Sequence, residues 1–241
     1  MAADTDTPRS RRERPAKPAL SRAAIVAASV AIMETEGLER VTMRRLAQEL
    51  DTGPASLYVY FRNTAALHAA ILDELLGEVN LGPATESGPW RERLIDILES
   101  YIQVLYARPS LARSTLIARP RGENYLALLE ALLAMLESGG VSRERAAWAL
   151  DLLLQFATAS AAEHGTRDQA ETQEDWTAYT TALSSVAAER YPHLVAVSGD
   201  LFTGTPRERL TWMFEVLLNG ILTAPAPAPS HHPAETPAIS G

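Results

Sequence analysis

The segment from Thr42 to Phe61 combines hydroxyl, basic, small and aromatic side chains in a pattern suited to contacting a nucleic acid. Apolar residues recur at helical spacing on both sides of Asp51-Thr52-Gly53, which predicts two short helices joined by a tight turn. The small residues from Pro54 to Ser56 would let the second helix bring its backbone close to base edges, and the hydroxyls of Tyr58 and Tyr60 could reach phosphate oxygens. The segment therefore favours sequence-specific binding of DNA.

The two helices carry their own start and stop residues. The Thr42 hydroxyl can accept a hydrogen bond from a free N–H of the first turn, and Gly53 tolerates the positive φ of a turn. Pro54 suits the first position of the second helix, where its missing N–H has no helical partner. Leu46 and Leu57 belong to apolar stripes that would face a core.

Two flanking helices are expected to complete the unit that positions this pair. Ser21 can cap a helix that ends at Gly37, and Asn63 or Thr64 can cap another one after the pair. Residues 19–80 are therefore expected to fold as one helical N-terminal domain.

Charge is distributed unevenly along the 241 residues. The net charge of −8 would be unusual for a DNA-binding protein. Residues 9–64, however, hold ten basic and six acidic side chains, whereas residues 65–241 hold twelve basic and twenty-two acidic ones. This segregation is expected if only one end meets phosphate. The basic, proline-broken residues 1–18 are expected to be a disordered arm, which either solubilises the chain or enters the minor groove.

Composition narrows the class of protein further. Without cysteine, neither a disulfide nor a thiolate metal site can form, and no apolar run reaches the length of a membrane span. The polar start is unlike a signal peptide, so we expect a cytoplasmic protein without membrane contact. Because no glycine-rich phosphate loop, nucleophile elbow or metal-ligand spacing occurs, we expect no catalytic residues, no metal and no cofactor.

The N-terminal motifs resemble those of a known family. Residues 20–79 are similar to the DNA-binding domain of the TetR (tetracycline repressor) family of bacterial transcriptional regulators. The motifs that carry the resemblance are Gly37-Leu38, Val41-Thr42-Met43-Arg44, Leu46-Ala47, Leu57-Tyr58 and Phe61-Arg62-Asn63. The resemblance implies a three-helix helix-turn-helix domain followed by a helical ligand-binding and dimerisation domain.

The resemblance also implies which residues touch DNA. The expected set is Thr42, Met43, Arg44, Arg45, Pro54, Ala55, Ser56, Tyr58, Tyr60, Arg62 and Thr64. Within it, Thr42, Arg62 and the two tyrosines would contact backbone phosphates, and Arg44 would reach a base edge such as guanine. Residues 54–56 would lie in the major groove. Two departures from the family pattern are expected to weaken the binding of DNA phosphates: Thr64 replaces the usual Lys, and Asp51 replaces the usual turn Gly.

The rest of the chain also has helical periodicity. No period-two strand pattern occurs, so the expected fold class is all-α, with a linker at 81–89, a second domain at 90–223 and a disordered Pro/Ala tail at 224–241. Helices are expected near 90–105, 109–119, 125–137, 142–164, 175–190 and 206–222, with a polar loop at 165–175 and an irregular stretch at 191–204.

The helices at 142–164 and 206–222 are expected to form a subunit interface. The first is rich in alanine, which allows close helix approach, and the second is apolar on more than one side because Trp212 and Val216 lie outside its main stripe. Burial within one subunit is the alternative. The resemblance favours a four-helix bundle between two copies. Such a dimer would hold its two DNA-binding domains roughly 34–36 Å apart over a near-palindromic operator.

The second domain resembles the tetracycline-repressor class, through motifs that include Ala118-Arg119-Pro120 and Glu163-His164. Thr115 stands where that class has a metal-ligating His, and Ala131 where it has a drug-contacting Gln, so the implied effector is small, largely apolar and bound without metal. The candidate pocket residues are Tyr101, Leu105, Arg113, Thr115, Arg119, Tyr125, Trp148, Gln155 and Trp176. The alternative is that the aromatic residues are ordinary core and the arginines cap helix ends.

These features together predict a ligand-responsive transcriptional regulator, with repression as the default of the family. A ligand that binds one dimer conformation more tightly would shift the population away from the DNA-binding one. A ligand-independent regulator or an activator of the same fold is the alternative.

Overall fold

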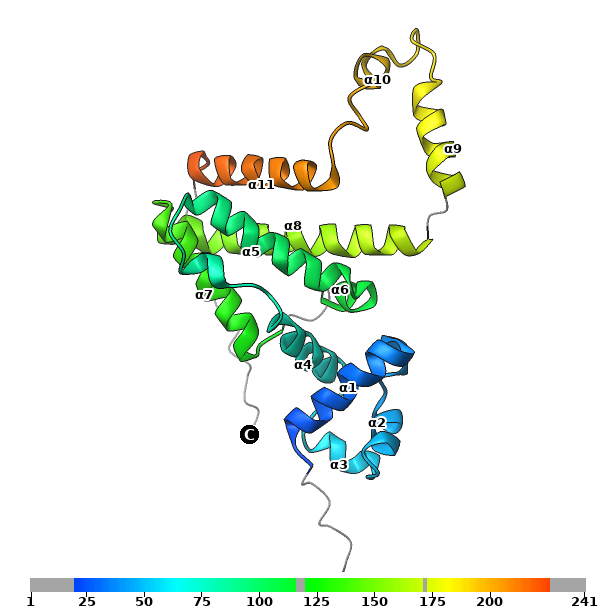
Figure 1. Cartoon of the computed structure of the whole chain (residues 1–241), viewed down its shortest axis with the longest axis vertical. Coiled ribbons are helices and arrows are strands. Elements are labelled where there is room, and N and C mark those ends of the chain that lie inside the picture. Colours follow the sequence, from blue (N-terminus) through cyan, green and yellow to red (C-terminus); the bar gives the residue numbers. More distant parts are fainter. Residues whose placement is uncertain (1–19, 116–119, 171–172, 226–241) are drawn as a thin grey trace, which may run out of the picture. The chain divides into compact units, whose positions relative to one another are not determined.

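A computed structural model describes residues 20–115, 120–170 and 173–225. The described residues form α-helices and short 3₁₀ turns without a strand, which confirms the predicted all-α class (Figure 1). The chain divides into two compact units, one up to Leu67 and the other from His68. The predicted arm and nearly all of the predicted tail lie outside the described residues.

The first unit holds α1 (Arg22–Glu36), a 3₁₀ turn (Leu38–Arg40), α2 (Met43–Glu49), α3 (Pro54–Tyr58) and the first turn of α4 (Thr64–Leu76). Its apolar stripes meet in a core in which the following side chains are at most 2% exposed: Ile25, Ile32, Leu46, Leu57, Phe61 and Leu67. Helices α2 and α3 pack against each other, and each contributes a fully buried leucine, Leu46 or Leu57, to this core.

The start residues predicted for this unit are confirmed. Ser21 Oγ accepts a hydrogen bond from the Ala24 N–H, and Thr42 Oγ1 accepts one from the Arg45 N–H, both at 3.1 Å. Asn63 Oδ1 accepts one from the Ala66 N–H at 2.8 Å. Gly37 ends α1 with a φ of +90°, which favours glycine.

The second unit is built on α5 (Trp90–Tyr106), which packs along α8 (Arg143–Ala170). Around this pair lie α6 (Pro109–Thr115), α7 (Glu123–Ser138) and α11 (Pro206–Thr223). Its fully buried side chains include Leu94, Ile97, Leu98, Leu105, Leu128, Leu132, Leu153 and Phe214. A short 3₁₀ turn (Gly82–Ala84) precedes α5 and packs against it, so the predicted linker at 81–89 is held to the domain.

Helices α8 and α11 run antiparallel (Figure 1). Arg145 Nη1 near the start of α8 donates a hydrogen bond of 2.8 Å to the Leu222 carbonyl near the end of α11. Further along, the rings of Phe156 and Phe214 meet edge to face, with centroids 5.3 Å apart. The helix predicted at 206–222 is confirmed, and Thr205 and Glu208 form a capping box at its start.

The helix predicted at 175–190 is present, but the boundaries predicted between residues 164 and 204 are wrong. Helix α8 continues to Ala170, α9 (Gln173–Ser184) follows within a few residues, and α10 (Pro192–Val197) occupies the stretch expected to be irregular. Neither α9 nor α10 has a buried residue. Their sequences therefore lack the buried apolar stripe on which the prediction of a helix depends. Among the described residues, no helix is both long and apolar enough to cross a bilayer.

Candidate functional site

The turn between α2 and α3 exposes the first turn of α3. Pro54 occupies its first position, as predicted, and Pro54, Ala55 and Ser56 are all exposed, while Leu57 is fully buried beneath them. A hollow of about 320 Å³ lies beside this turn and is lined by Arg44, Ala47, Gln48, Asp51, Thr52 and Pro54. The structure thus places the exposed Arg44 at the same hollow as Pro54, the first of the residues expected to enter a groove.

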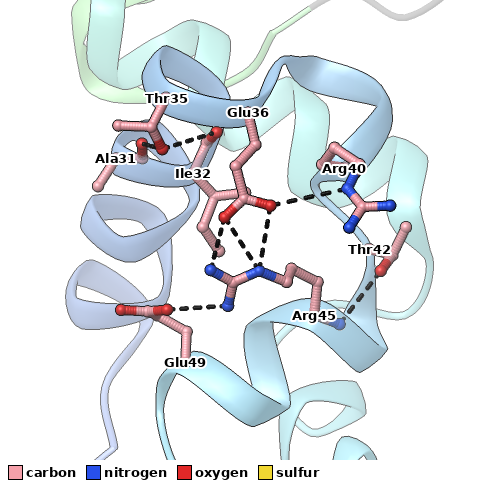
Figure 2. A network of polar contacts seen from close by, with 8 residues as sticks. All are labelled: Ala31, Ile32, Thr35, Glu36, Arg40, Thr42, Arg45 and Glu49. Atoms are coloured by element: carbon pink, nitrogen blue, oxygen red, sulfur yellow. Dashed lines mark hydrogen bonds and ion pairs between the residues drawn. The ribbon is translucent and has the colours of Figure 1, made fainter.

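Arg45 lies next to Arg44 in sequence, but its guanidinium binds two carboxylates of the protein (Figure 2). Its Nη2 donates to Glu36 Oε1 at 2.6 Å, its Nε donates to both Glu36 oxygens, and its Nη1 donates to Glu49 Oε2 at 2.8 Å. The hydrogen bond from Arg45 holds the pKa of the Glu36 carboxyl below its usual value. These ion pairs connect α1 to α2 and give Arg45 a structural role, unlike the DNA contact expected from the sequence.

Two further members of the expected DNA-contacting set, Met43 and Tyr60, make contacts within the protein. Met43 is only 5% exposed because it packs in the core of the first unit. The Tyr60 hydroxyl donates a hydrogen bond of 2.6 Å to the Leu20 carbonyl, so its proton is not available to a phosphate. Arg22 reinforces this contact, since its Nη1 donates to the Tyr60 carbonyl at 3.3 Å and its guanidinium lies 4.3 Å from the centre of the Phe61 ring.

The remaining predicted contacts lie on the surface of the first unit. Thr42, Arg62 and Thr64 are exposed, and Tyr58 is 53% exposed. Val59 is 82% exposed directly after Tyr58, and the sequence analysis missed it. Val59 is apolar but lies outside the stripe formed by Leu57 and Phe61, and this position in the sequence could have indicated that it is exposed.

The core of the second unit contains one buried polar contact between α5 and α8. The Tyr101 hydroxyl lies 2.8 Å from Thr158 Oγ1, and the two side chains are 2% and 6% exposed. Burial raises the pKa of Tyr101 to about 12, and the nearby Tyr125 contributes in the same direction. Leu105 lies one turn further along α5 and is fully buried. Thr158 was missed in the sequence, where it is one small residue among many alanines.

The structure does not bring the other predicted pocket residues to Tyr101. Trp148 and Gln155 lie on the exposed side of α8, and Arg113 is exposed on α6. Trp176 packs against Tyr179 and Phe202, with ring centroids 5.9 and 5.7 Å away.

The last two predicted pocket residues are not placed. Thr115 ends α6 and its side chain is not described, and Arg119 lies outside the described residues. Within the described chain, no three acidic or histidine side chains gather closely enough to hold a metal ion.

Both units match domains of one family. Residues 25–71 match the family model described as bacterial regulatory proteins, tetR family. Residues 82–224 match the model of the tetracyclin repressor-like C-terminal domain. The chain belongs to the TetR family. It is therefore a DNA-binding transcriptional regulator, and the predicted resemblance is confirmed.

Solved structures and curated proteins resemble this TetR-family regulator along much of its length. The transcription regulator SCO7704 from Streptomyces coelicolor is 52% identical, with 89% of this chain and 100% of that chain covered and a TM-score of 0.73. The TetR family protein ActR from the same organism, solved in complex with actinorhodin, is 33% identical, with 85% and 97% covered and a TM-score of 0.75.

Among curated proteins, the repressor DrrR1 of Streptomyces coeruleorubidus is 27% identical over 212 residues, which is 85% of this chain and 78% of that protein. An HTH-type transcriptional regulator of Saccharopolyspora erythraea is 33% identical over 128 residues, and this TetR-family regulator spans only 53% of its length.

Proposed function

We propose that this regulator is a repressor, which binds a near-palindromic operator as a homodimer in the cytoplasm and leaves it when a small effector binds without metal. The observation that carries the proposal is the exposed first turn of α3 beside Arg44, within the stretch 9–64 whose local charge is positive. The 27% identity to DrrR1, which is named a repressor, favours repression over activation.

In this proposal the DNA contacts come from the exposed members of the predicted set. Arg44 reads a base edge, and residues 54–56 lie in the major groove. Thr42, Tyr58, Arg62 and Thr64 bind phosphates. Val59 joins them, because a side chain that is 82% exposed at the end of α3 can contact a thymine methyl group.

The N-terminal arm extends the same surface. Because Tyr60 binds the Leu20 carbonyl, Leu20, the first described residue, lies beside the end of α3. We infer that the basic residues of 1–18 enter the neighbouring minor groove. Deleting them should weaken operator binding and flatten its salt dependence, whereas an unchanged salt slope would assign the arm to solubility alone.

The proposed dimer uses the exposed apolar residues of α8 and α11. Trp148 and Leu152 of α8 are 61% and 42% exposed, and Trp212 and Val216 of α11 are 67% and 48% exposed. Residues of this size are usually buried, and on each helix the two lie four residues apart, on one face. A two-fold pairing of both helices with their twins would remove all four from water.

The effector is proposed to bind near Tyr101, Thr158 and Tyr125. A buried tyrosine–threonine pair in an apolar core supplies the few polar groups that orient a ligand. Ala131 of α7, where the tetracycline-repressor class has a drug-contacting Gln, is 8% exposed. Because ActR is 33% identical and was solved with actinorhodin, actinorhodin is the first effector to try.

The test begins with selection of an operator from a random duplex library by the full-length protein. A mobility-shift titration with the selected duplex then measures release by actinorhodin, alone and with added Mg²⁺. Release without Mg²⁺, together with a raised melting temperature, supports the proposal. Selection of a single half-site would count against the proposed homodimer, and DNA binding that actinorhodin does not change would count against this effector.

A further inference from the structure

Helix α7 begins without a capping side chain of its own. Its N-cap is Gly122, and the hydrogen bond that a capping side chain would normally provide comes from α4 instead. Asp73 Oδ1 accepts the backbone N–H of Tyr125, the third residue of α7, at 3.0 Å. In return, Asn124 Nδ2 donates to the Asp73 carbonyl at 2.9 Å. Two reciprocal bonds therefore connect α4 to the first turn of α7.

The backbone of Gly122 is shaped to this carboxylate. A Cβ added at Gly122 would lie 1.8 Å from Asp73 Oδ2 and 2.2 Å from its Cγ, closer than any side chain tolerates. The carboxylate also lies where the partial positive charge of the helix N-terminus favours an anion. Glycine at 122 and aspartate at 73 thus form one matched contact.

This contact adjoins the buried polar pair in the core. The same residue, Tyr125, uses its backbone to bind Asp73, and its helix α7 packs against α5, which carries Tyr101, and against α8. Tyr101 in turn bonds to Thr158 of α8. Because packed interiors shift as units and do not deform continuously, a change around Tyr101 that moves the first turn of α7 must also move Asp73.

Helix α4 is continuous from Thr64 to Leu76, and its first turn belongs to the helix-turn-helix unit. We propose that Asp73 is a positioning residue that caps α7 from α4 and couples the state of the Tyr101–Tyr125 core to the DNA-contacting unit. The coupling is reciprocal. If an effector in the core changes operator affinity, operator binding must also change the first turn of α7. The effector half of this inference rests on the proposed function; the operator half does not.

The test measures hydrogen–deuterium exchange of the full chain, free and bound to the selected operator duplex. In the wild type, operator binding should change exchange in residues 123–128. In Asp73→Ala, exchange in this turn should rise roughly fivefold in the free protein, the size of a lost N-cap, and the operator-induced change should disappear. Operator affinity itself should stay within about threefold of wild type. The control is Glu74→Ala, which removes the neighbouring exposed carboxylate of α4 and should behave as wild type.

Two further variants separate coupling from simple stabilisation. Asp73→Asn keeps an oxygen that accepts the Tyr125 N–H and should retain the operator-induced change. Gly122→Ala displaces the carboxylate from the α7 side and should abolish the change, which provides the measurement should D73A fail to fold.

Faster exchange in D73A with the operator-induced difference intact would overturn the proposal and leave Asp73 a static cap. An absence of any such change in the wild type would also overturn it. Failure of actinorhodin to release the operator counts only against the proposed effector.

Discussion

At the scale of single residues, Asp51 is the least favourable choice in the helix-turn-helix. Its φ of +46° lies in the left-handed region, and its carboxylate lines the hollow beside Arg44. Asp51→Gly should raise the free energy of unfolding by up to about 1 kcal/mol and tighten operator binding, because it removes backbone strain and a negative charge near DNA. Thermal unfolding and operator titration measure the two effects. Asp51→Asn tolerates this φ without the charge, so it should tighten binding with little gain in stability; equal affinities of all three proteins would contradict the argument.

Glu36 gives the first unit a stability that depends on pH. Because Arg45 lowers its pKa in the folded protein, its contribution is present above the ordinary carboxylate range and is lost as the pH falls through the lowered value. Glu36→Gln should therefore melt below wild type at pH 7, and the difference should shrink as the pH falls through and below the ordinary carboxylate range. Glu39→Gln, which changes an exposed carboxylate of the same region, is the control. A difference that persists in acid would assign the effect to something other than this ion pair.

The residues that the sequence alone could assign are those whose partners are local. The caps at Ser21, Thr42 and Asn63 bond within three residues; the first two were predicted, and Asn63 was one of the two alternatives. By contrast, Arg45 binds Glu36 from another helix, and Tyr60 binds a carbonyl forty positions away. Periodicity and motif resemblance contain no information on such partners, which is why both residues were expected on DNA.

At the scale of elements, the end of α7 depends on two adjacent glycines for different reasons. A Cβ at Gly139 would lie 2.4 Å from the Trp90 ring, whereas Gly140 has open space around it but a φ of +76°. Gly139→Ala should cost about 1–3 kcal/mol through overlap, and Gly140→Ala about 1 kcal/mol through backbone strain. Double-mutant cycles with Trp90→Ala, followed by chemical denaturation, should show coupling for G139A and none for G140A. Equal coupling energies would refute this division.

The helices themselves were predictable wherever one face is buried. The segments 90–105, 125–137 and 206–222 were placed to within a few residues, because each has an apolar stripe that the core requires. In the region 165–204 the helix predicted at 175–190 is present as α9, but its bounds, the continuation of α8 and the helix α10 were not predicted. The reason is that α9 and α10 have no buried residue and the end of α8 is polar. Their helical state depends on propensity and tertiary setting, which a hydrophobic pattern does not report.

At the scale of the whole molecule, positive charge is concentrated in residues 9–64, whereas residues 65–241 are acidic. This division could be read from the sequence, because charge counts need no knowledge of contacts. The two compact units divide inside α4, after Leu67, whereas the sequence predicts the domain boundary at the linker residues 81–89. Those residues are held in place by α5, where Arg93 Nη1 donates to the Glu86 carbonyl at 2.6 Å.

The proposed dimer predicts that one surface residue controls operator affinity from a helix far along the chain. Trp212 is 67% exposed on α11, so Trp212→Glu should leave the monomer folded but place an uncompensated charge in the two-fold interface. Light scattering should show a monomer, and operator affinity should fall roughly 100-fold or more, because the second half-site is no longer tethered to the first. Leu126→Glu makes the same kind of change at a residue of α7 that is 56% exposed and should affect neither measurement. A W212E protein that remains dimeric with wild-type affinity would exclude α11 from the interface, and the exposed residues of α8 would then need another partner.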